Sequence, residues 1–186
     1  MTLSVSAQKD ELKTLKKIYA KEIPSATDMQ EYKAAIAKLE TSATEEGDKI
    51  YTNFYKCMTP IMDVKALGKN VSQMQLANAF TPKAIENLAT GLNATLDYEK
   101  KSGKKIYTDD ILETITSYKP EVVNLAVALS NAKRYNEAAD VLNSLYLLDK
   151  KDTDKLFYSA SLYVNGKDYD KALKGYEELK RLNYSG

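Results

Sequence analysis

Apolar residues recur every three or four positions along most of this chain, which is the spacing that gathers them on one face of an α-helix. The spacing predicts a helix over residues 9–23, a second helix that starts after Thr27, and a third over residues 45–66. No stretch alternates apolar and polar residues as a half-buried β-strand would, and no Asn-Gly or Asp-Gly pair joins two β-branched runs. The pattern therefore predicts an all-α fold.

Prolines and capping residues predict where several of these helices begin and end. Pro24 ends the first helix, because a residue that precedes proline avoids the helical conformation. Thr27 caps the second helix, and Gln30 completes a capping box with it. Pro60 kinks or splits the third helix. After the loop that follows this third helix, we expect a short helical segment over residues 71–80.

Two more helices are expected before residue 119. Thr81-Pro82 joins a capping threonine to a proline at the first helical position, so a helix starts there and reaches about residue 100. Ser102-Gly103 stops that helix. Thr108 caps the next one, which we expect to end near Tyr118.

The rest of the chain repeats itself with a period of 34 residues. Residues 119–152 align with residues 153–186 without a gap. The matched pairs are Val122 with Leu156, Leu125-Ala126 with Ser159-Ala160, Leu129 with Tyr163, Lys133-Arg134-Tyr135 with Lys167-Asp168-Tyr169, Ala138 with Ala172, Leu142 with Tyr176, and Leu145 with Leu179. A fixed period in the range of roughly 20–50 residues is typical of repeat architectures.

This repeat resembles the tetratricopeptide repeat family, in which each repeat is one helical hairpin. Ala126 and Ala160 match the family's small residue in mid-helix. Tyr135 and Tyr169 match its aromatic residue at the turn, and Ala138 and Ala172 match its close-packing alanine. Lys150 and Tyr184 stand where the family has its closing proline. Val122 and Leu156 stand where the family has its first-position tryptophan.

The resemblance implies an α-α superhelix of antiparallel helical hairpins, a solenoid of the tetratricopeptide type. Ala138 and Ala172 would let helices approach closely, and a larger side chain there would cost roughly 1–3 kcal/mol. Upstream the match weakens, since Asp110 stands where the alanine should follow Tyr107. Residues 9–118 are therefore interpreted as degenerate hairpins, followed by two tandem repeats, 119–152 and 153–186.

The resemblance also implies a concave groove that is lined by the first helix of each hairpin and binds a peptide. The residues expected to face it are Val123, Val127, Ser130, Asn131, Phe157, Ser161, Val164 and Asn165. Asn131 and Asn165 hold the same repeat position, where an asparagine ladder can bind a peptide backbone because each amide both donates and accepts. Alternatively, both amides satisfy the local backbone near the turn.

Some family members clamp a C-terminal carboxylate with lysines and arginines in this groove. Valine, phenylalanine and serine stand at such positions here, at Val123, Val127, Phe157 and Ser161. We therefore do not expect a carboxylate clamp, and the mixed apolar and amide lining suits an extended or helical peptide.

Charge and composition argue against several other functions. The 27 Lys+Arg and 26 Asp+Glu residues leave a net charge of +1, without the basic excess that is usual in nucleic-acid binders. No apolar run approaches the roughly 20 residues that span a bilayer. Histidine is absent, and Cys57 lies on an apolar helix face, where a thiol is inert. We therefore expect no enzymatic activity, no cofactor, no metal, no nucleic acid and no integral membrane segment.

The first residues resemble the end of a secretory signal peptide. Val5 and Ala7 are small enough for the two positions before a cleavage site, and the chain becomes highly charged from Lys9. We expect residues 1–8 to be a disordered remnant of this kind, in an exported bacterial protein of the periplasm or cell envelope. The alternative is that these residues are a short frayed N-terminus with no function.

The second repeat ends at Gly186 without the polar capping helix that usually closes a solenoid. We therefore expect either a piece of a longer protein or an apolar face that meets a partner. Together these features favour a non-catalytic scaffold that binds a partner protein or peptide. Two alternatives stay open: an accessory helical segment of a longer envelope protein or enzyme, and a binder of a small apolar ligand. A closed apolar cavity would indicate the ligand binder, whereas an open groove would indicate the scaffold.

Overall fold

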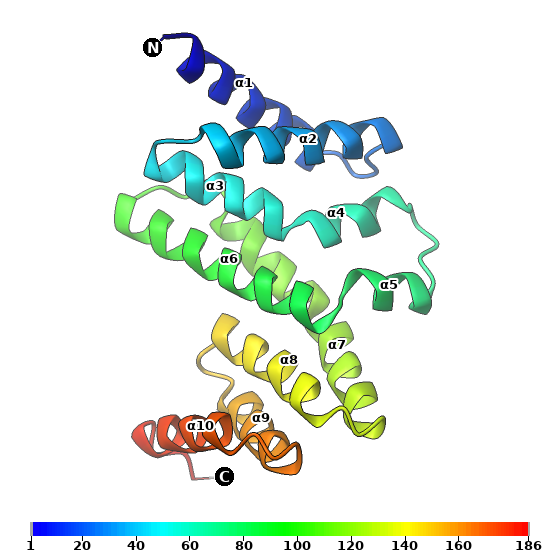
Figure 1. The fold of residues 1–186 in the computed structure, drawn as a ribbon, viewed down its shortest axis with the longest axis vertical. Helices are drawn as coiled ribbons and strands as arrows, with labels where there is room; N and C mark the ends of the chain where they lie inside the picture. Colours follow the sequence, from blue (N-terminus) through cyan, green and yellow to red (C-terminus); the bar gives the residue numbers. More distant parts are fainter. Residues whose placement is uncertain (1, 186) are drawn as a thin grey trace. The chain divides into compact units, whose positions relative to one another are not determined.

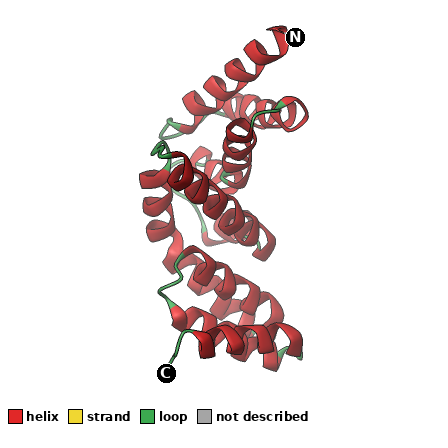
Figure 2. Cartoon of the chain, turned by 90° about the vertical axis from the view of Figure 1, so that its left-hand side faces the viewer, coloured by secondary structure: helices red, strands yellow, loops and turns green. Residues whose placement is uncertain are grey.

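The structure, a computed structural model, describes residues 2–185, and it describes side chains from Gln8 onward except that of Gln73. Every regular element within these residues is an α-helix, and Figure 2 shows only helices and connecting loops. The all-α prediction is confirmed for this part of the chain. In order along the chain (Figure 1), the helices are α1 (Thr2–Tyr19), α2 (Ala26–Ser42), α3 (Glu46–Cys57), α4 (Thr59–Ala66), α5 (Gln73–Ala79), α6 (Pro82–Ser102), α7 (Thr108–Asn131), α8 (Tyr135–Leu148), α9 (Thr153–Asn165) and α10 (Tyr169–Arg181).

The chain divides into two compact units. The first runs to Phe80 and takes up Ala94–Ile106, and the second contains Thr81–Asn93 and the chain from Tyr107 onward. Helix α6 contributes its first half to the second unit and its second half to the first. The candidate site lies wholly within the second unit.

The first unit has a core of aromatic and aliphatic residues between α1, α2 and α3. Leu15, Leu39 and Phe54 are fully buried there. Tyr32 is buried as well, and its hydroxyl is satisfied because it donates a hydrogen bond of 2.7 Å to the carbonyl of Tyr55. The ring of Tyr55 packs edge-on against that of Tyr32, with the centroids 6.1 Å apart.

Two helix starts in this unit differ from the sequence prediction. Helix α1 begins at Thr2 rather than at residue 9, and it ends at Tyr19, before Pro24. The cap of α2 is Ser25 rather than Thr27, because the carboxylate of Asp28 reaches back to the Ser25 N–H over 2.8 Å. An ionised carboxylate is a stronger capping partner than the neutral amide of Gln30, and it also complements the positive end of the helix.

Pro60 splits the third predicted helix as expected. Helix α3 ends at Cys57 and α4 starts at Thr59, which leaves Pro60 in the first turn of α4, where its missing N–H costs no helical hydrogen bond. Gly68 follows α4 with a φ of 82°, which fits the predicted loop.

In the second unit, α6 starts at Pro82, as predicted, and the Thr81 hydroxyl accepts a hydrogen bond of 3.2 Å from the Ala84 N–H. The prediction for the next helix was wrong at its end. Helix α7 runs without a break through Pro120 to Asn131, and its cap is Tyr107, not Thr108. Proline in a helix interior costs about 3 kcal/mol. Buried side chains on both sides of it, Ile111 before and Val122 after, hold the two halves in one helix.

The turn that joins α7 to α8 recurs between α9 and α10. Lys133 and Lys167 occupy the left-handed region with φ values of 60° and 62°. The N–H of the next residue closes each turn in a Schellman-type bond. These bonds join Arg134 N–H to the Leu129 carbonyl and Asp168 N–H to the Tyr163 carbonyl, each over 2.9 Å. The 34-residue period seen in the sequence is therefore present in the backbone from α7 to α10.

The alanines expected to mediate close packing are buried. Ala138 and Ala172 lie in the interior of α8 and α10, as predicted. Ala172 packs with Ala139 of α8 and Tyr163 of α9, so it belongs to the contact between successive hairpins.

Candidate functional site

A cleft of about 470 Å³ lies between α7 and α9 on the second unit. Its lining residues are Val123, Ala126, Val127, Ser130 and Asn131 of α7, Leu142 of α8, and Lys155, Tyr158, Ser161, Leu162 and Asn165 of α9. The cleft is open to solvent, and most of its lining is apolar.

Six of the eight residues expected in the groove line this cleft, and Phe157 and Val164 do not. On α9 the face turned to the cleft carries Tyr158, Ser161 and Asn165, spaced as one side of a helix. Phe157 and Val164 each precede a lining residue by one position, which turns their side chains away by about 100°. Phe157 instead stacks on Tyr184, with ring centroids 5.6 Å apart and planes at 28°.

Sequence reasoning also missed residues that deepen the cleft. Ala126 and Leu142 come from the two helices of the first hairpin, and Lys155, Tyr158 and Leu162 come from α9. Tyr158 could have been recognised from its spacing to Ser161 and Asn165. The contribution of Leu142 depends on how α8 packs behind α7, which the sequence pattern does not specify.

The cleft lining includes the side-chain amides of Asn131 and Asn165. They occupy equivalent places at the ends of α7 and α9, and both side chains are exposed. Neither side-chain amide makes a hydrogen bond with any part of the chain that the structure describes. The structure therefore does not show the alternative, in which both amides form hydrogen bonds with the nearby backbone. Two amides, each with donors and an acceptor, are available to a ligand.

The cleft lining contains a single charged residue. The ammonium of Lys155 lies 3.5 Å from a carboxylate oxygen of Asp152, which also pairs with Lys119 at 2.7 Å. Ser161 is engaged as well, since its hydroxyl lies 3.1 Å from that of Tyr176. One ammonium that already has a carboxylate partner does not form a clamp for a second carboxylate.

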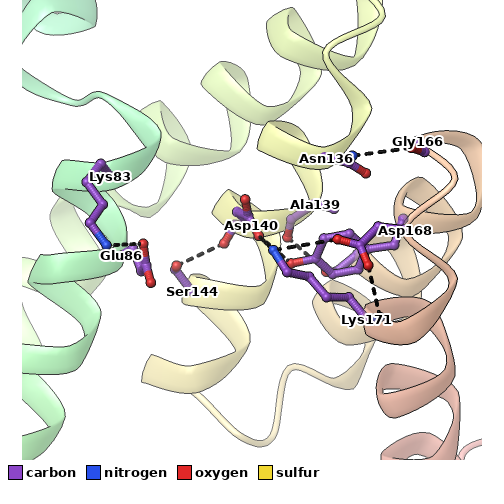
Figure 3. A network of polar contacts seen from close by, with 11 residues as sticks. Lys83, Glu86, Asn136, Ala139, Asp140, Ser144, Gly166, Asp168 and Lys171 are labelled. Carbon is purple, nitrogen blue, oxygen red and sulfur yellow. Dashed lines mark hydrogen bonds and ion pairs between the residues drawn. The ribbon is translucent and has the colours of Figure 1, made fainter.

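A polar network on another face of the hairpins holds α8, α9 and α10 together (Figure 3). Asp140 is its centre: it accepts a hydrogen bond of 2.6 Å from the Tyr163 hydroxyl and one of 2.8 Å from the Lys171 ammonium. Ser159 donates to the carbonyl of Ala139 over 2.8 Å. Burial, followed by the Asp140 carboxylate, raises the pKa of Tyr163 above its ordinary value, so the tyrosine stays a neutral donor.

This network borders a second cleft of about 420 Å³. Carboxylates and ammoniums are mixed along it: Glu86, Asp140 and Glu178 against Lys150, Lys171 and Lys174. Most of these charges already have a partner, for example Lys171 with Asp140 between the hairpins and Glu86 with Lys83 on α6. We therefore assign this network a structural role: it fixes the position of α9, and through it the α7–α9 cleft.

Cys57 is buried, and burial raises the pKa of its thiol to about 12, so it stays protonated and inert. The described residues contain no group of three or more carboxylates and thiols arranged to hold a metal ion. None of the helices in that region is both long and apolar enough to cross a bilayer. The side chains of Val5 and Ala7 lie outside those described, so export stays a prediction.

Comparison of the chain with family models, with curated proteins and with solved structures found no match.

Proposed function

We propose that this protein is a non-catalytic scaffold of the tetratricopeptide type, which binds an extended segment of a partner protein in the α7–α9 cleft. The observation that carries the proposal is the pair of equivalent amides, Asn131 and Asn165, that border a mostly apolar cleft and have no partner within the described residues. An extended peptide offers the matching groups, because it presents a backbone N–H and carbonyl at every residue and side chains on alternating faces.

The openness of the cleft favours a peptide over a small apolar ligand. A small ligand is usually enclosed on most of its surface, whereas the α7–α9 cleft is open along one side and bordered by amides. The apolar floor, with Val127 and Leu162, is suited to one or two aliphatic side chains of the bound segment.

The test is a selection of random linear peptides displayed on phage, with the full chain as the target. The affinity of an enriched peptide would then be measured by fluorescence anisotropy. Replacing both Asn131 and Asn165 by alanine removes two ligand hydrogen bonds and should weaken binding about tenfold or more. Val127→Asp should abolish binding, because it puts a charge on the apolar floor.

Asn124→Ala is the matched control. Asn124 is exposed on the same helix but does not line the cleft, so this variant should bind as the wild type does. If the enriched peptides bind the Asn131/Asn165 double variant and the Val127 variant with unchanged affinity, the cleft is not the binding site and the proposal is wrong.

A further inference from the structure

Tyr158 presents an aromatic ring to the α7–α9 cleft, and its neighbours support that ring. The residue lines the cleft and is 56% exposed. Its ring meets that of Phe157 edge-on, with the centroids 5.6 Å apart, and Phe157 in turn stacks on Tyr184. The Tyr184 hydroxyl donates a hydrogen bond of 2.9 Å to Asp154. The exposed ring is therefore held before a ligand arrives, which reduces the entropy that is lost on binding.

The apolar part of the cleft offers a ligand no hydrogen-bond acceptor. Val123, Val127 and Leu162 line it, whereas the unpaired amides of Asn131 and Asn165 stand at the last residues of α7 and α9. A backbone N–H of the ligand that faces the apolar side chains would therefore lose its water without gaining a partner. Proline has no backbone N–H, so a proline at such a position avoids this cost.

The polar side chains of the lining complement the carbonyls of such a segment. The hydroxyls of Ser130 and Tyr158, like the two asparagine amides, make no hydrogen bond with the described residues, and all of them can donate. Proline keeps its carbonyl as an acceptor. Lys155, the single charged residue of the lining, is already paired with Asp152. An uncharged segment with more acceptors than donors therefore matches the cleft.

The helical walls of the cleft favour polyproline II over a β-strand as the conformation of the bound segment. Every regular element within residues 2–185 is a helix, so this part of the chain has no strand edge with which a bound strand could pair. A polyproline II helix needs no such partner, because it makes no internal hydrogen bonds and its backbone stays solvated. Proline-rich segments dock on exposed aromatic rings, and Tyr158 provides one in the cleft.

We propose that the segment bound in the α7–α9 cleft is rich in proline and adopts the polyproline II conformation. This inference rests on the proposed function, because it names the class of peptide that the same cleft binds. One proline ring packs on the Tyr158 ring, and further prolines lie on Val127 and Leu162. The amides of Asn131 and Asn165 donate to carbonyls of the segment beyond this apolar floor.

Fluorescence anisotropy with the full chain tests this proposal. The probe is a fluorescein-labelled peptide of about ten prolines, which forms roughly three turns of polyproline II helix. The reference peptide alternates glycine and serine over the same length, and the proline peptide should bind about tenfold more tightly or better. Tyr158→Ala should weaken binding of the proline peptide about tenfold, whereas Tyr158→Phe keeps the ring and should weaken it only a few-fold. Tyr169→Ala is the control, since Tyr169 is also exposed but does not line the cleft, and this variant should bind as the wild type does.

The outcomes separate a failure of this inference from a failure of the proposed function. If the proline peptide binds no better than the reference peptide, or if Tyr158→Ala binds it as the wild type does, the proline preference is wrong. Phage-selected peptides that lack proline but lose affinity in the Asn131/Asn165 double variant would also overturn the proline preference, while the cleft would remain the binding site. Selected peptides that keep their affinity in that variant and in the Val127 variant would overturn the proposed function, and this inference with it.

Discussion

Gly175 on α10 lies directly against Ala160 on α9, so closely that a β-carbon on Gly175 would stand 2.9 Å from the Ala160 Cβ. Alanine is ordinarily favoured over glycine inside a helix by about 1 kcal/mol. Here the added methyl would meet a side chain that cannot rotate away, and overpacking costs roughly 1–3 kcal/mol. We therefore expect Gly175→Ala to destabilise the protein by up to about 2 kcal/mol, measured by urea unfolding.

A double-mutant cycle separates this contact from general effects on the helix. Ala160→Gly removes the opposing methyl, so the pair of substitutions together should cost less than the sum of the two single ones, with a coupling of about 1 kcal/mol or more. Ser117→Ala, at an exposed site on α7, should change stability by less than about 0.5 kcal/mol. Strict additivity of Gly175→Ala and Ala160→Gly would show that α9 and α10 do not meet at this point.

Lys167 provides a second test because its left-handed backbone is unusual for a residue with a side chain. Its φ of 62° costs roughly 1 kcal/mol for an L-residue and nothing for glycine. Lys167→Gly should therefore stabilise the protein by about 0.5 kcal/mol, after the greater entropy of glycine in the unfolded chain is allowed for. Lys174→Gly, within helix α10, should destabilise it by about 1 kcal/mol. Thermal unfolding should therefore show a higher midpoint for Lys167→Gly and a lower midpoint for Lys174→Gly than for the wild type. If both variants lose the same stability, the left-handed turn at Lys167 is contradicted.

The sequence could predict those features that depend on local spacing. The start of α6 at Pro82 follows from a pattern within a few residues, and the structure confirms it. Ala138 and Ala172 were recognised from the 34-residue period and the family resemblance, and both are buried. The end of α7 could not be predicted, since the local penalty at Pro120 is outweighed by buried contacts on both sides of it. Of the eight residues that the family resemblance implied for a groove, six line the α7–α9 cleft. On α9, Phe157 and Val164 stand one position away from the residues that line it.

The hydroxyl of Tyr163 is expected to stabilise the contact between the two hairpins. It donates to Asp140 over 2.6 Å from a ring that is almost fully buried, and a hydrogen bond to a charged group contributes more than a neutral one. Tyr163→Phe should cost about 1–2 kcal/mol in urea unfolding. Asp140 would keep its ion pair with Lys171, so no charge would be left without a partner.

Tyr158→Phe is the control for this substitution. The Tyr158 hydroxyl makes no hydrogen bond with the described residues, and the ring is more than half exposed. This variant should change the free energy of unfolding by less than about 0.5 kcal/mol. A Tyr163→Phe variant that is as stable as Tyr158→Phe would mean that the Asp140 network contributes nothing measurable to stability.

Glu178 should make stability depend on acid pH. Its hydrogen bond with Arg181, followed by that with the Tyr146 hydroxyl, lowers the pKa of the carboxyl from 4.5 to about 2. A carboxyl with a lowered pKa in the folded state stabilises the fold above its unfolded pKa, and this contribution is lost as the pH falls through the folded value. Glu178→Gln should therefore have a lower unfolding midpoint than the wild type at pH 7. The difference should shrink from pH 4.5 downward and vanish near pH 2. Asp28, whose pKa is also lowered to about 2, titrates in both proteins and cancels in the comparison. A difference in midpoint that stays constant from pH 7 to pH 2 would show that Glu178 acts through packing and not through its charge.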